Sequence, residues 1–323
     1  MFNRVLITGA AGFIGSAIAR RVIELGAKQV VGLDRISDYY DAELKRRNIA
    51  TWLGDGHVLI EEDLCDADLP SILDGVDVVF HQAGQPGVRP SWGKSFDLYL
   101  RDNVLATQKL LEGVKAAAPT ARVVYASSSS VYGNADVYPT SEEVAPRPVS
   151  PYGVTKLAAE HLTCLYAHNF GLSTVSLRYF TVYGPGQRPD MAFTRFCLAA
   201  QRGTEIEIYG TGTQIRDFTY IDDVVEANIL AATRDVPGGS VINIAGGGSS
   251  TLSECVDIIG RLSGSPIPRK QFPVATGDVY RTGGSTARAA RYLGWSAKTP
   301  LEEGLRSQLN WARELDYSKN AVS

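Results

Sequence analysis

Short apolar runs alternate with amphipathic stretches through the first half of the chain. The runs predict strands at residues 4–8, 29–34, 57–61, 76–81, 121–126 and 173–178. The stretches between them include helical patterns over residues 16–23, 96–118 and 152–170. Strands that alternate with helices at this spacing predict an α/β fold with a doubly wound parallel sheet.

The pattern changes after residue 179. A turn-rich, basic loop precedes further predicted elements, which are helices at 191–202 and 224–233, strands at 205–209 and 241–245, and a capping box at 251–254. The strand at 241–245 is expected to rejoin the large sheet, and no linker separates the segments. We therefore predict a first domain over 1–178, with a return near 241–245, and a smaller, interwoven domain formed mainly by 179–323. The polar residues 318–323 are expected to fray.

A glycine-rich turn joins the first strand to the first helix. It reads Thr8-Gly9-Ala10-Ala11-Gly12-Phe13-Ile14-Gly15. Glycines let the backbone approach a pyrophosphate closely, and the free N–H groups of a helix N-terminus bind that group. The order of strand, turn and helix predicts a dinucleotide-binding site at Gly9, Gly12, Phe13, Ile14 and Gly15.

Other candidate cofactor contacts stand at the carboxyl ends of predicted strands. Asp34 ends the second strand about 20 residues beyond the glycines, where a carboxylate accepts a hydrogen bond from the adenosine ribose of NAD. The same charge repels the 2′-phosphate of NADP, although Arg35 follows it. Gln82 and Ala83 follow the fourth strand and are expected beside the cofactor. NAD is therefore the predicted cofactor.

A tyrosine and a lysine form the candidate catalytic pair. Pro151 suits a first helical turn, so Tyr152 and Lys156 lie one turn apart on one helix face. The pKa of a phenol is about 10, and an adjacent ammonium favours the phenolate, so Tyr152 is a candidate base near neutral pH. The same spacing occurs on ordinary solvated helix faces, and the assignment depends on the accompanying motifs. One of these is the serine cluster 127–130, which the fifth strand carries to the same sheet edge.

Composition and charge exclude several classes of function. Charged residues make up 21% of the 323 residues and the net charge is −3, so neither nucleic acid nor an anionic membrane is an expected partner. No apolar run reaches the length of a membrane span, and a strand pattern begins at Val5 without a signal peptide. The four cysteines lack Cys-x-x-Cys spacing and the four histidines do not cluster. These patterns predict a cytoplasmic protein without a metal site.

Together, these motifs resemble the extended short-chain dehydrogenase/reductase family over nearly the whole chain. The matching set is Thr8-Gly9-x-x-Gly12-x-x-Gly15, Asp34, Asp63-Leu64, the segment 127–133 and Tyr152-x-x-x-Lys156. Within that family the chain looks like the nucleotide-sugar epimerases, and segments 87–93 and 181–190 look most like UDP-glucuronate 4-epimerases. The resemblance implies a Rossmann-type fold and tightly held NAD. It also implies oxidation of a sugar hydroxyl to a ketone, rotation of the ring and return of hydride to the other face.

The resemblance also implies roles for individual residues. Tyr152 is the implied base on the sugar 4-hydroxyl, Lys156 orients the nicotinamide ribose, and Ser128 donates to the reacting oxygen. Asp63 and Leu64 join the cofactor contacts. The implied contacts with a UDP-sugar are Arg89, Ser128, Ser129, Thr181, Arg188, Tyr209, Gln214, Arg216 and Arg281.

The serine cluster narrows the reaction. Related sugar dehydratases carry Thr-Asp-Glu directly before Val-Tyr-Gly, and decarboxylating relatives keep a Glu there, whereas this chain has Ser128-Ser129-Ser130. The absence of a carboxylate at these positions favours epimerisation over elimination. Galactose-type epimerases usually place Asn where Thr181 stands, so conversion of UDP-glucuronate to UDP-galacturonate is the favoured interpretation. The alternatives are a UDP-glucose or UDP-N-acetylglucosamine 4-epimerase, then a UDP-glucuronate decarboxylase, and an inactive NAD-binding scaffold.

Some expectations on the substrate side stay open. Arg188 is as well suited to a diphosphate contact or a surface charge as to a glucuronate carboxylate. Arg216 is a better diphosphate ligand, and Tyr209 is placed to pack on uracil. Many relatives have Arg just before the Gly277-Asp278 pair, whereas this chain has Ala275-Thr276, and Arg281 is a candidate replacement. The helices near 96–118 and 152–170 are expected to pair across a two-fold axis in a homodimer, as in relatives.

Overall fold

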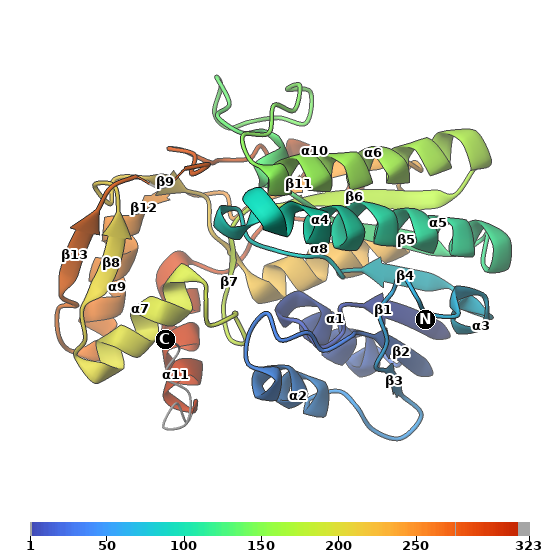
Figure 1. Ribbon diagram of the computed structural model, residues 1–323, viewed down its shortest axis with the longest axis horizontal. Coiled ribbons are helices and arrows are strands. Elements are labelled where there is room, and N and C mark those ends of the chain that lie inside the picture. Colours follow the sequence, from blue (N-terminus) through green and yellow to red (C-terminus); the bar gives the residue numbers. More distant parts are fainter. Residues whose placement is uncertain (1, 275, 316–323) are drawn as a thin grey trace.

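The predicted sheet is present and contains seven parallel strands (Figure 1). The computed structural model describes residues 2–274 and 276–315. In spatial order the strands are β11 (Ser240–Ile244), β6 (Ser173–Tyr179), β5 (Arg122–Ser128), β4 (Val78–His81), β1 (Arg4–Thr8), β2 (Gln29–Leu33) and β3 (Val58–Ile60). Because these strands are parallel, their carboxyl ends meet along one edge, which is where ligands bind in such sheets.

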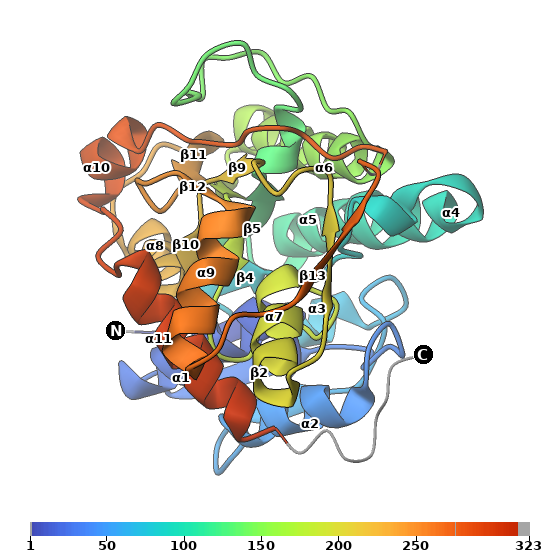
Figure 2. The ribbon, with the colours of Figure 1, turned by 90° about the vertical axis from the view of Figure 1, so that its left-hand side faces the viewer.

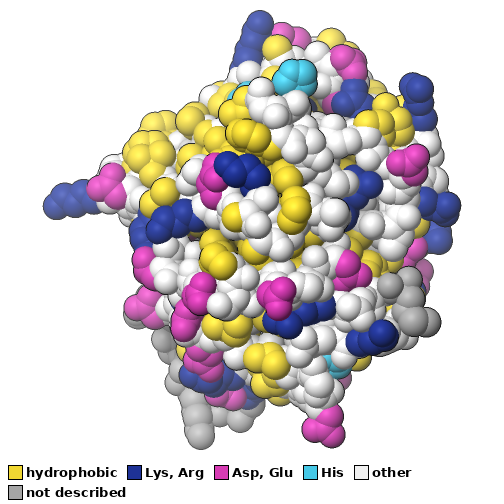
Figure 3. Space-filling model, turned by 90° about the vertical axis from the view of Figure 1, so that its right-hand side faces the viewer, with side chains coloured by type: hydrophobic (Ala, Val, Ile, Leu, Met, Phe, Trp, Pro, Cys, Tyr) yellow, Lys and Arg dark blue, Asp and Glu magenta, His cyan; other side chains and the backbone are white. Residues whose placement is uncertain are grey.

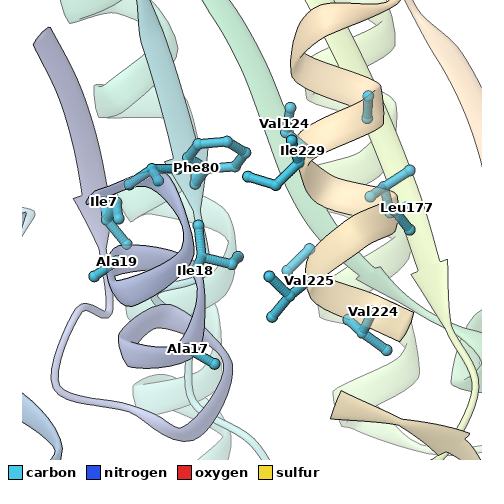
Figure 4. Close-up of a cluster of buried hydrophobic side chains, with 14 of the residues drawn as sticks. Ile7, Ala17, Ile18, Ala19, Phe80, Val124, Leu177, Val224, Val225 and Ile229 are labelled. Atoms are coloured by element: carbon cyan, nitrogen blue, oxygen red, sulfur yellow. The ribbon is translucent and has the colours of Figure 1, made fainter. Parts of the chain in front are cut away.

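Helices cover both faces of the sheet and divide its core into two clusters. On one face α1 (Phe13–Glu24) and α8 (Ile221–Thr233) lie side by side, and their apolar side chains pack with those of Phe80 and Val124 (Figure 4). The other face is covered by α3 (Leu69–Leu73), α5 (Ala106–Ala117) and α6 (Pro151–Phe170). Burial on both faces explains why the strands are apolar runs rather than alternating patterns.

A smaller group of elements stands beside the sheet (Figures 1 and 2). Its helices α7 (Ala192–Arg202), α9 (Leu252–Ser263) and α11 (Leu301–Arg313) pack around one apolar cluster. Its short strand pairs are β8 (Ile206–Tyr209) with β13 (Arg269–Phe272), β7 (Val182–Tyr183) with β10 (Thr219–Tyr220), and β9 (Ile215–Arg216) with β12 (Ser250–Thr251).

The chain passes between the sheet and this smaller group more than once. It leaves the sheet after β6 and returns at β11, which confirms the predicted return near 241–245. α8 and α10 (Ala287–Leu293) also contact elements of the sheet layer. The division into domains near residue 178 stays a prediction.

The predicted strands and helices are confirmed with several corrections. α1 begins at Phe13 rather than 16, the third strand covers only Val58–Ile60, and α8 begins at Ile221 rather than 224. The capping box is present, since Thr251 Oγ1 accepts from Glu254 N at 3.1 Å and Glu254 Oε2 accepts from Thr251 N at 2.7 Å. The sequence patterns did not predict α2 (Ala42–Ala50), α3, α10 or α11. Ala275 and residues 318–323, on which two expectations depend, lie outside the described residues.

The helix predicted over 96–118 is not a uniform α-helix. α4 (Phe96–Tyr99) continues into the π-helical segment η3 (Leu100–Leu105) and then into α5. In η3 the Asn103 side chain accepts from Gln85 N at 2.7 Å and donates to Thr155 Oγ1 at 2.9 Å. These contacts join segments far apart in the sequence, so the hydrophobic pattern of the helix does not predict the wider turn.

Candidate active site

One cavity runs along the carboxyl edge of the sheet and gathers the predicted cofactor contacts. Every residue predicted to bind the cofactor lines it, from Gly9 in the first turn to Lys156 in α6. Arg188, which was predicted to bind substrate, lines the same cavity. Several other residues also line the cavity and were not predicted from the sequence, among them Ser37, Tyr39, Tyr40, Lys45 and Asp102.

The glycine-rich turn fits a pyrophosphate. Gly9 has a φ of 71°, and a Cβ there would lie 2.7 Å from Ala83 N. A Cβ on Gly15 would collide with the carbonyl oxygen of Gly9. The N-cap of α1 is Gly12, whose position provides no side-chain cap, and the first turn carries no acidic residue. The turn therefore presents backbone N–H groups and a positive helix end to an anion, as NAD requires.

The acidic residues that are predicted to contact the cofactor, Asp34 and Asp63, are held by hydrogen bonds. Asp34 Oδ2 accepts from Ala11 N at 3.0 Å and Oδ1 accepts from Ile36 N at 2.8 Å. Burial disfavours ionisation of Asp63, but hydrogen bonds from Arg101 and Arg35 outweigh it and lower the pKa of Asp63 to about 2. The Asp63 carboxylate is thus already paired with two guanidinium groups, which no local sequence pattern indicates.

Tyr152 and Lys156 share one face at the start of α6, as predicted. Ser150 caps this helix, since its Oγ accepts from Gly153 N at 3.1 Å, and Pro151 occupies the first turn. The ring of Tyr99 packs edge-on against that of Tyr152 at 6.3 Å. Ser128, at the end of β5, is within hydrogen-bonding contact of the Tyr152 hydroxyl.

The charge relation within this pair differs from the expectation. Burial raises the pKa of Tyr152 above 10, although the hydrogen bond with Ser128 and the charge of Arg188 oppose the rise. Burial also lowers the pKa of Lys156 to about 7, with Glu160 acting in the opposite direction. The expectation of a phenolate favoured by a neighbouring ammonium therefore fails among the protein's own groups, because both side chains lose hydration.

Lys156 should make the stability of the dinucleotide-free protein depend on pH. Its folded-state pKa of about 7 lies below its ordinary value of 10.5, so the unfolded state binds more protons between these values. Burying the ammonium thus costs stability at neutral pH, and the cost disappears as the pH rises. We expect Lys156→Met to raise the free energy of unfolding at pH 7 by more than about 1 kcal/mol, with a smaller gain at pH 9.5. Urea unfolding of both proteins at the two pH values measures this, and an equal gain at both would contradict the titration.

A buried hydrogen-bond network lies one helical turn beyond Lys156. Glu160, one turn beyond Lys156, accepts from Arg178 Nε at 2.9 Å, from Arg178 Nη2 at 2.6 Å and from Ser127 Oγ at 2.6 Å. Arg178 Nη1 donates to the Tyr132 hydroxyl at 2.7 Å, which donates to Asn243 Oδ1 at 2.8 Å. The network ties α6 to β5, β6 and β11. The recurrence of polar residues every four positions after Tyr152 was the only signal for Glu160 in the sequence.

The predicted substrate contacts divide into groups. The guanidinium of Arg89 lies 4.1 Å from the centre of the Tyr209 ring and pairs with Asp278 at 2.8 Å, so these residues meet across the two parts of the molecule. The side chain of Gln214 donates to the backbone carbonyl of Tyr209. Uracil packing on Tyr209 stays a prediction, and one face of that ring is covered by Arg89.

The remaining predicted contacts lie at other places along the chain. Arg216 donates to the carbonyls of Val279 at 2.6 Å and Tyr280 at 3.0 Å, and Arg281 lies over the ring of Tyr138 at 4.7 Å. Ser129 begins the short turn after β5, and Thr181 lies between β6 and β7. Their contacts with a sugar stay predictions.

Arg188 lies at the cofactor cavity. Its Nε and Nη2 donate to Asp190 at 2.9 Å each, and its guanidinium is 5.8 Å from the centre of the Tyr39 ring. Its charge also lowers the pKa of Tyr152. Arg188 thus lines the same cavity as the candidate base and is largely buried, which favours a ligand contact over a surface charge. Its contact with a sugar stays a prediction.

Two features are absent from the described residues. Within residues 2–274 and 276–315, no cluster of histidine, cysteine or acidic side chains is arranged to hold a metal ion. No helix in that part of the chain is long and apolar enough to cross a membrane.

Known proteins resemble this chain in sequence and structure. A family profile described as "NAD dependent epimerase/dehydratase family" matches residues 5–245. An uncharacterised UDP-glucose epimerase, YtcB, of Bacillus subtilis (strain 168) is 37% identical over 97% of this chain and 98% of its own. A UDP-glucuronate 4-epimerase of Thermodesulfobacterium geofontis (strain OPF15) is 35% identical over 96% of each chain. The crystal structure of UDP-glucuronic acid 4-epimerase from Bacillus cereus, in complex with UDP-glucuronic acid and NAD, is 39% identical, has a TM-score of 0.93 and covers 96% of this chain and 99% of its own.

Proposed function

Because this chain belongs to the NAD dependent epimerase/dehydratase family, we propose that it is an NAD-dependent UDP-sugar 4-epimerase that interconverts UDP-glucuronate and UDP-galacturonate. The observation that carries this proposal is the position of Tyr152. It contacts Ser128 and lines the same cavity as the glycine-rich turn, so a proton acceptor stands beside a dinucleotide site. The Bacillus cereus epimerase, which holds NAD and UDP-glucuronic acid, shares the fold over nearly the whole chain.

The chain's own groups perform the proton chemistry. NAD, when bound, would supply reversible hydride transfer at the sugar carbon, and Gly9, Gly12, Gly15, Asp34 and Lys156 would hold it. Tyr152 takes the proton from the 4-hydroxyl and returns it after the ring has turned, while Ser128 donates to the same oxygen. Burial raises the pKa of Tyr152, which makes its phenolate a stronger base but a less populated form near neutral pH. The hydrogen bond with Ser128 and the positive charge of Arg188 oppose this rise by stabilising the phenolate that accepts the proton.

Elimination and decarboxylation receive less support from this site. Ser129 and Ser130 occupy the positions at which the resemblance places carboxylates in relatives with those activities. Glu160 lies beneath them but is fully engaged by Arg178 and Ser127. An epimerase needs no further acid or base beyond Tyr152.

A UDP-glucose or UDP-N-acetylglucosamine 4-epimerase is the second candidate. The Bacillus subtilis relative, which carries the name of a UDP-glucose epimerase, is as similar in sequence as the glucuronate enzymes. Incubating the purified protein with UDP-glucuronate, UDP-glucose and UDP-N-acetylglucosamine separately, and resolving the products chromatographically, distinguishes the candidates. Rapid conversion of UDP-glucose without conversion of UDP-glucuronate would reject the first. Release of a pentose product would favour the decarboxylase, and no conversion at all would favour the inactive scaffold.

Arg188 should distinguish the glucuronate substrate. The 4-keto form of a glucuronyl group is a β-keto acid that loses carbon dioxide when its carboxylate is not held. We expect Arg188→Ala to weaken the binding of UDP-glucuronate by roughly tenfold or more relative to that of UDP-glucose, because a charge-assisted hydrogen bond is lost. Alternatively, the variant should release a pentose product. Calorimetric titration with each UDP-sugar, and mass spectrometry of the products, measure these effects.

A matched control for this variant is Arg195→Ala, whose exposed guanidinium pairs with Glu207 at 3.3 Å. This variant should change the affinity for neither UDP-glucuronate nor UDP-glucose. If Arg188→Ala instead weakened the binding of all UDP-sugars equally, Arg188 would be assigned to the diphosphate.

We also propose that the protein is a homodimer in the cytoplasm. Several apolar side chains on α4, η3 and α6 are more than one-third exposed, namely Leu98, Leu100, Leu105, Val154, Leu165 and Phe170. Hydrophobic side chains gather in the upper left of the face shown in Figure 3. A second copy would cover such a surface by helix packing, and light scattering tests the molecular mass. The four free cysteines fit a reducing compartment.

A further inference from the structure

The turn after β2 directs two neighbouring side chains apart. Asp34 faces the glycine-rich turn, where it accepts from Ala11 N, and it also accepts from Ile36 N. Ile36 has a φ of 46°, in the left-handed region that non-glycine residues rarely adopt. Between them, Arg35 extends toward η3.

Two carboxylates hold the Arg35 guanidinium. Arg35 Nη1 and Nη2 donate to the two oxygens of Asp102 at 2.9 and 2.5 Å, and Nη1 also donates to Asp63 at 2.9 Å. The Asp102 side chain is 8% exposed, so this bidentate pair is largely removed from water. Arg101 pairs with Asp63 at 2.5 Å and with Asp66 at 2.8 Å. This cluster contains one more carboxylate than guanidinium, so it offers a phosphate no surplus positive charge.

The π-helical segment places Asp102 in this cluster. η3 carries both Asp102, which lines the cofactor cavity, and Asn103, which binds the backbone of Gln85 in the cavity wall. A single wide turn thus positions two residues at the cofactor site, and π-helical turns often mark functional sites.

We propose that Asp102, assisted by Asp63, determines the preference for NAD over NADP by keeping Arg35 away from the adenosine ribose. An arginine near this ribose is the usual partner of the NADP 2′-phosphate. Here the phosphate would meet the carboxylate of Asp34, while the adjacent guanidinium is committed to Asp102. Asp102 is a positioning residue, and the inference rests on the dinucleotide site of the proposed function.

Lys45, like Arg35, is a cation that lines the cofactor cavity. Its Nζ donates to the Ser37 carbonyl at 2.7 Å and to Ser37 Oγ at 2.9 Å, and its side chain is buried. A test must therefore separate an effect of Arg35 from one of Lys45.

Competition between the two dinucleotides tests the proposal directly. Each purified protein is incubated with equal concentrations of NAD and NADP, freed of unbound nucleotide and denatured, and the released dinucleotides are quantified. Asp34→Asn is expected to raise the ratio of bound NADP to bound NAD by about tenfold, because a like charge is removed. Adding Asp102→Asn should raise the ratio at least about tenfold more, because Arg35 becomes free to bind the phosphate. Adding Arg35→Ala should return the ratio to that of Asp34→Asn alone.

Two results would overturn the proposal. One is an unchanged ratio of bound NADP to bound NAD when Asp102→Asn is added. The other is an increase in that ratio that persists after Arg35→Ala, because the increase would then be due to Lys45 or to net charge. If the Asp102 variants fail to fold, Arg35→Ala in the Asp34→Asn background tests the proposal instead. A change in NADP binding below about threefold supports an Arg35 that is held by Asp102. A tenfold fall in NADP binding shows that Arg35 already reaches the phosphate and overturns the proposal. A wild-type protein that binds neither dinucleotide would overturn the proposed function as well, which separates the two failures.

Discussion

Replacing Tyr152 with phenylalanine is expected to reduce turnover by roughly three or more orders of magnitude while NAD and the UDP-sugar still bind. The substitution removes the hydroxyl that contacts Ser128 but leaves the ring, which packs edge-on against Tyr99 at 6.3 Å. The loss should therefore fall on kcat rather than on affinity. Product formation followed by chromatography gives kcat, and calorimetric titration gives the two binding constants.

Tyr166→Phe is the matched control for this prediction. Tyr166 lies farther along the same helix, where its hydroxyl donates to Glu112 at 2.5 Å. Its variant should turn over at nearly the wild-type rate. Turnover of Tyr152→Phe within about tenfold of wild type would remove the tyrosine from the catalytic role.

Glu160→Ala should have the largest effect on stability, lowering the free energy of unfolding by about 3–5 kcal/mol. The carboxylate accepts three hydrogen bonds, and its side chain and that of Arg178 are 2% and 5% exposed. Removing the acid leaves the Arg178 charge buried without its main partner. Denaturant unfolding monitored by far-UV circular dichroism measures the change.

Two further variants separate a buried charge from simple loss of side-chain volume. Replacing both partners, Glu160→Leu with Arg178→Met, should recover part of the stability, because no charge is then left unpaired. Arg46→Ala breaks an exposed pair with Glu61 at 3.4 Å and should cost less than about 1 kcal/mol. A loss for Glu160→Ala no larger than for Arg46→Ala would contradict the structural role of the buried pair.

Local sequence patterns were sufficient to predict the elements that depend on local chemistry. The turn from Gly9 to Gly15 needs glycine because of its backbone geometry, and Tyr152 and Lys156 share a face because of helical periodicity. The strands are buried on both faces, so their continuous apolar runs predict them without knowledge of the neighbouring strands. The return of the chain at β11 followed from the same kind of run.

Features that depend on distant partners could not be predicted in this way. Arg35 and Asp102 are 67 residues apart in sequence, and nothing in the spacing of either indicates that they pair. The wide turn of η3 depends on contacts of Asn103 with Gln85 and Thr155. The predicted direction of the Tyr152 pKa shift was wrong, because the sequence shows the neighbouring lysine but not the burial that raises the pKa of the phenol.

The insertion of β11 beside β6 has a consequence for synthesis on the ribosome. The cavity-lining residues from Gly9 to Lys156 emerge first, yet the sheet edge at β6 and the apolar face beneath α8 stay uncovered until residues 221–244 have left the exit tunnel. Chains are made from the N-terminus at about 5–20 residues per second, so this interval lasts seconds. The nascent chain therefore exposes a bare strand edge during that time, and a ribosome stalled before residue 240 would hold an intermediate prone to aggregation or chaperone capture.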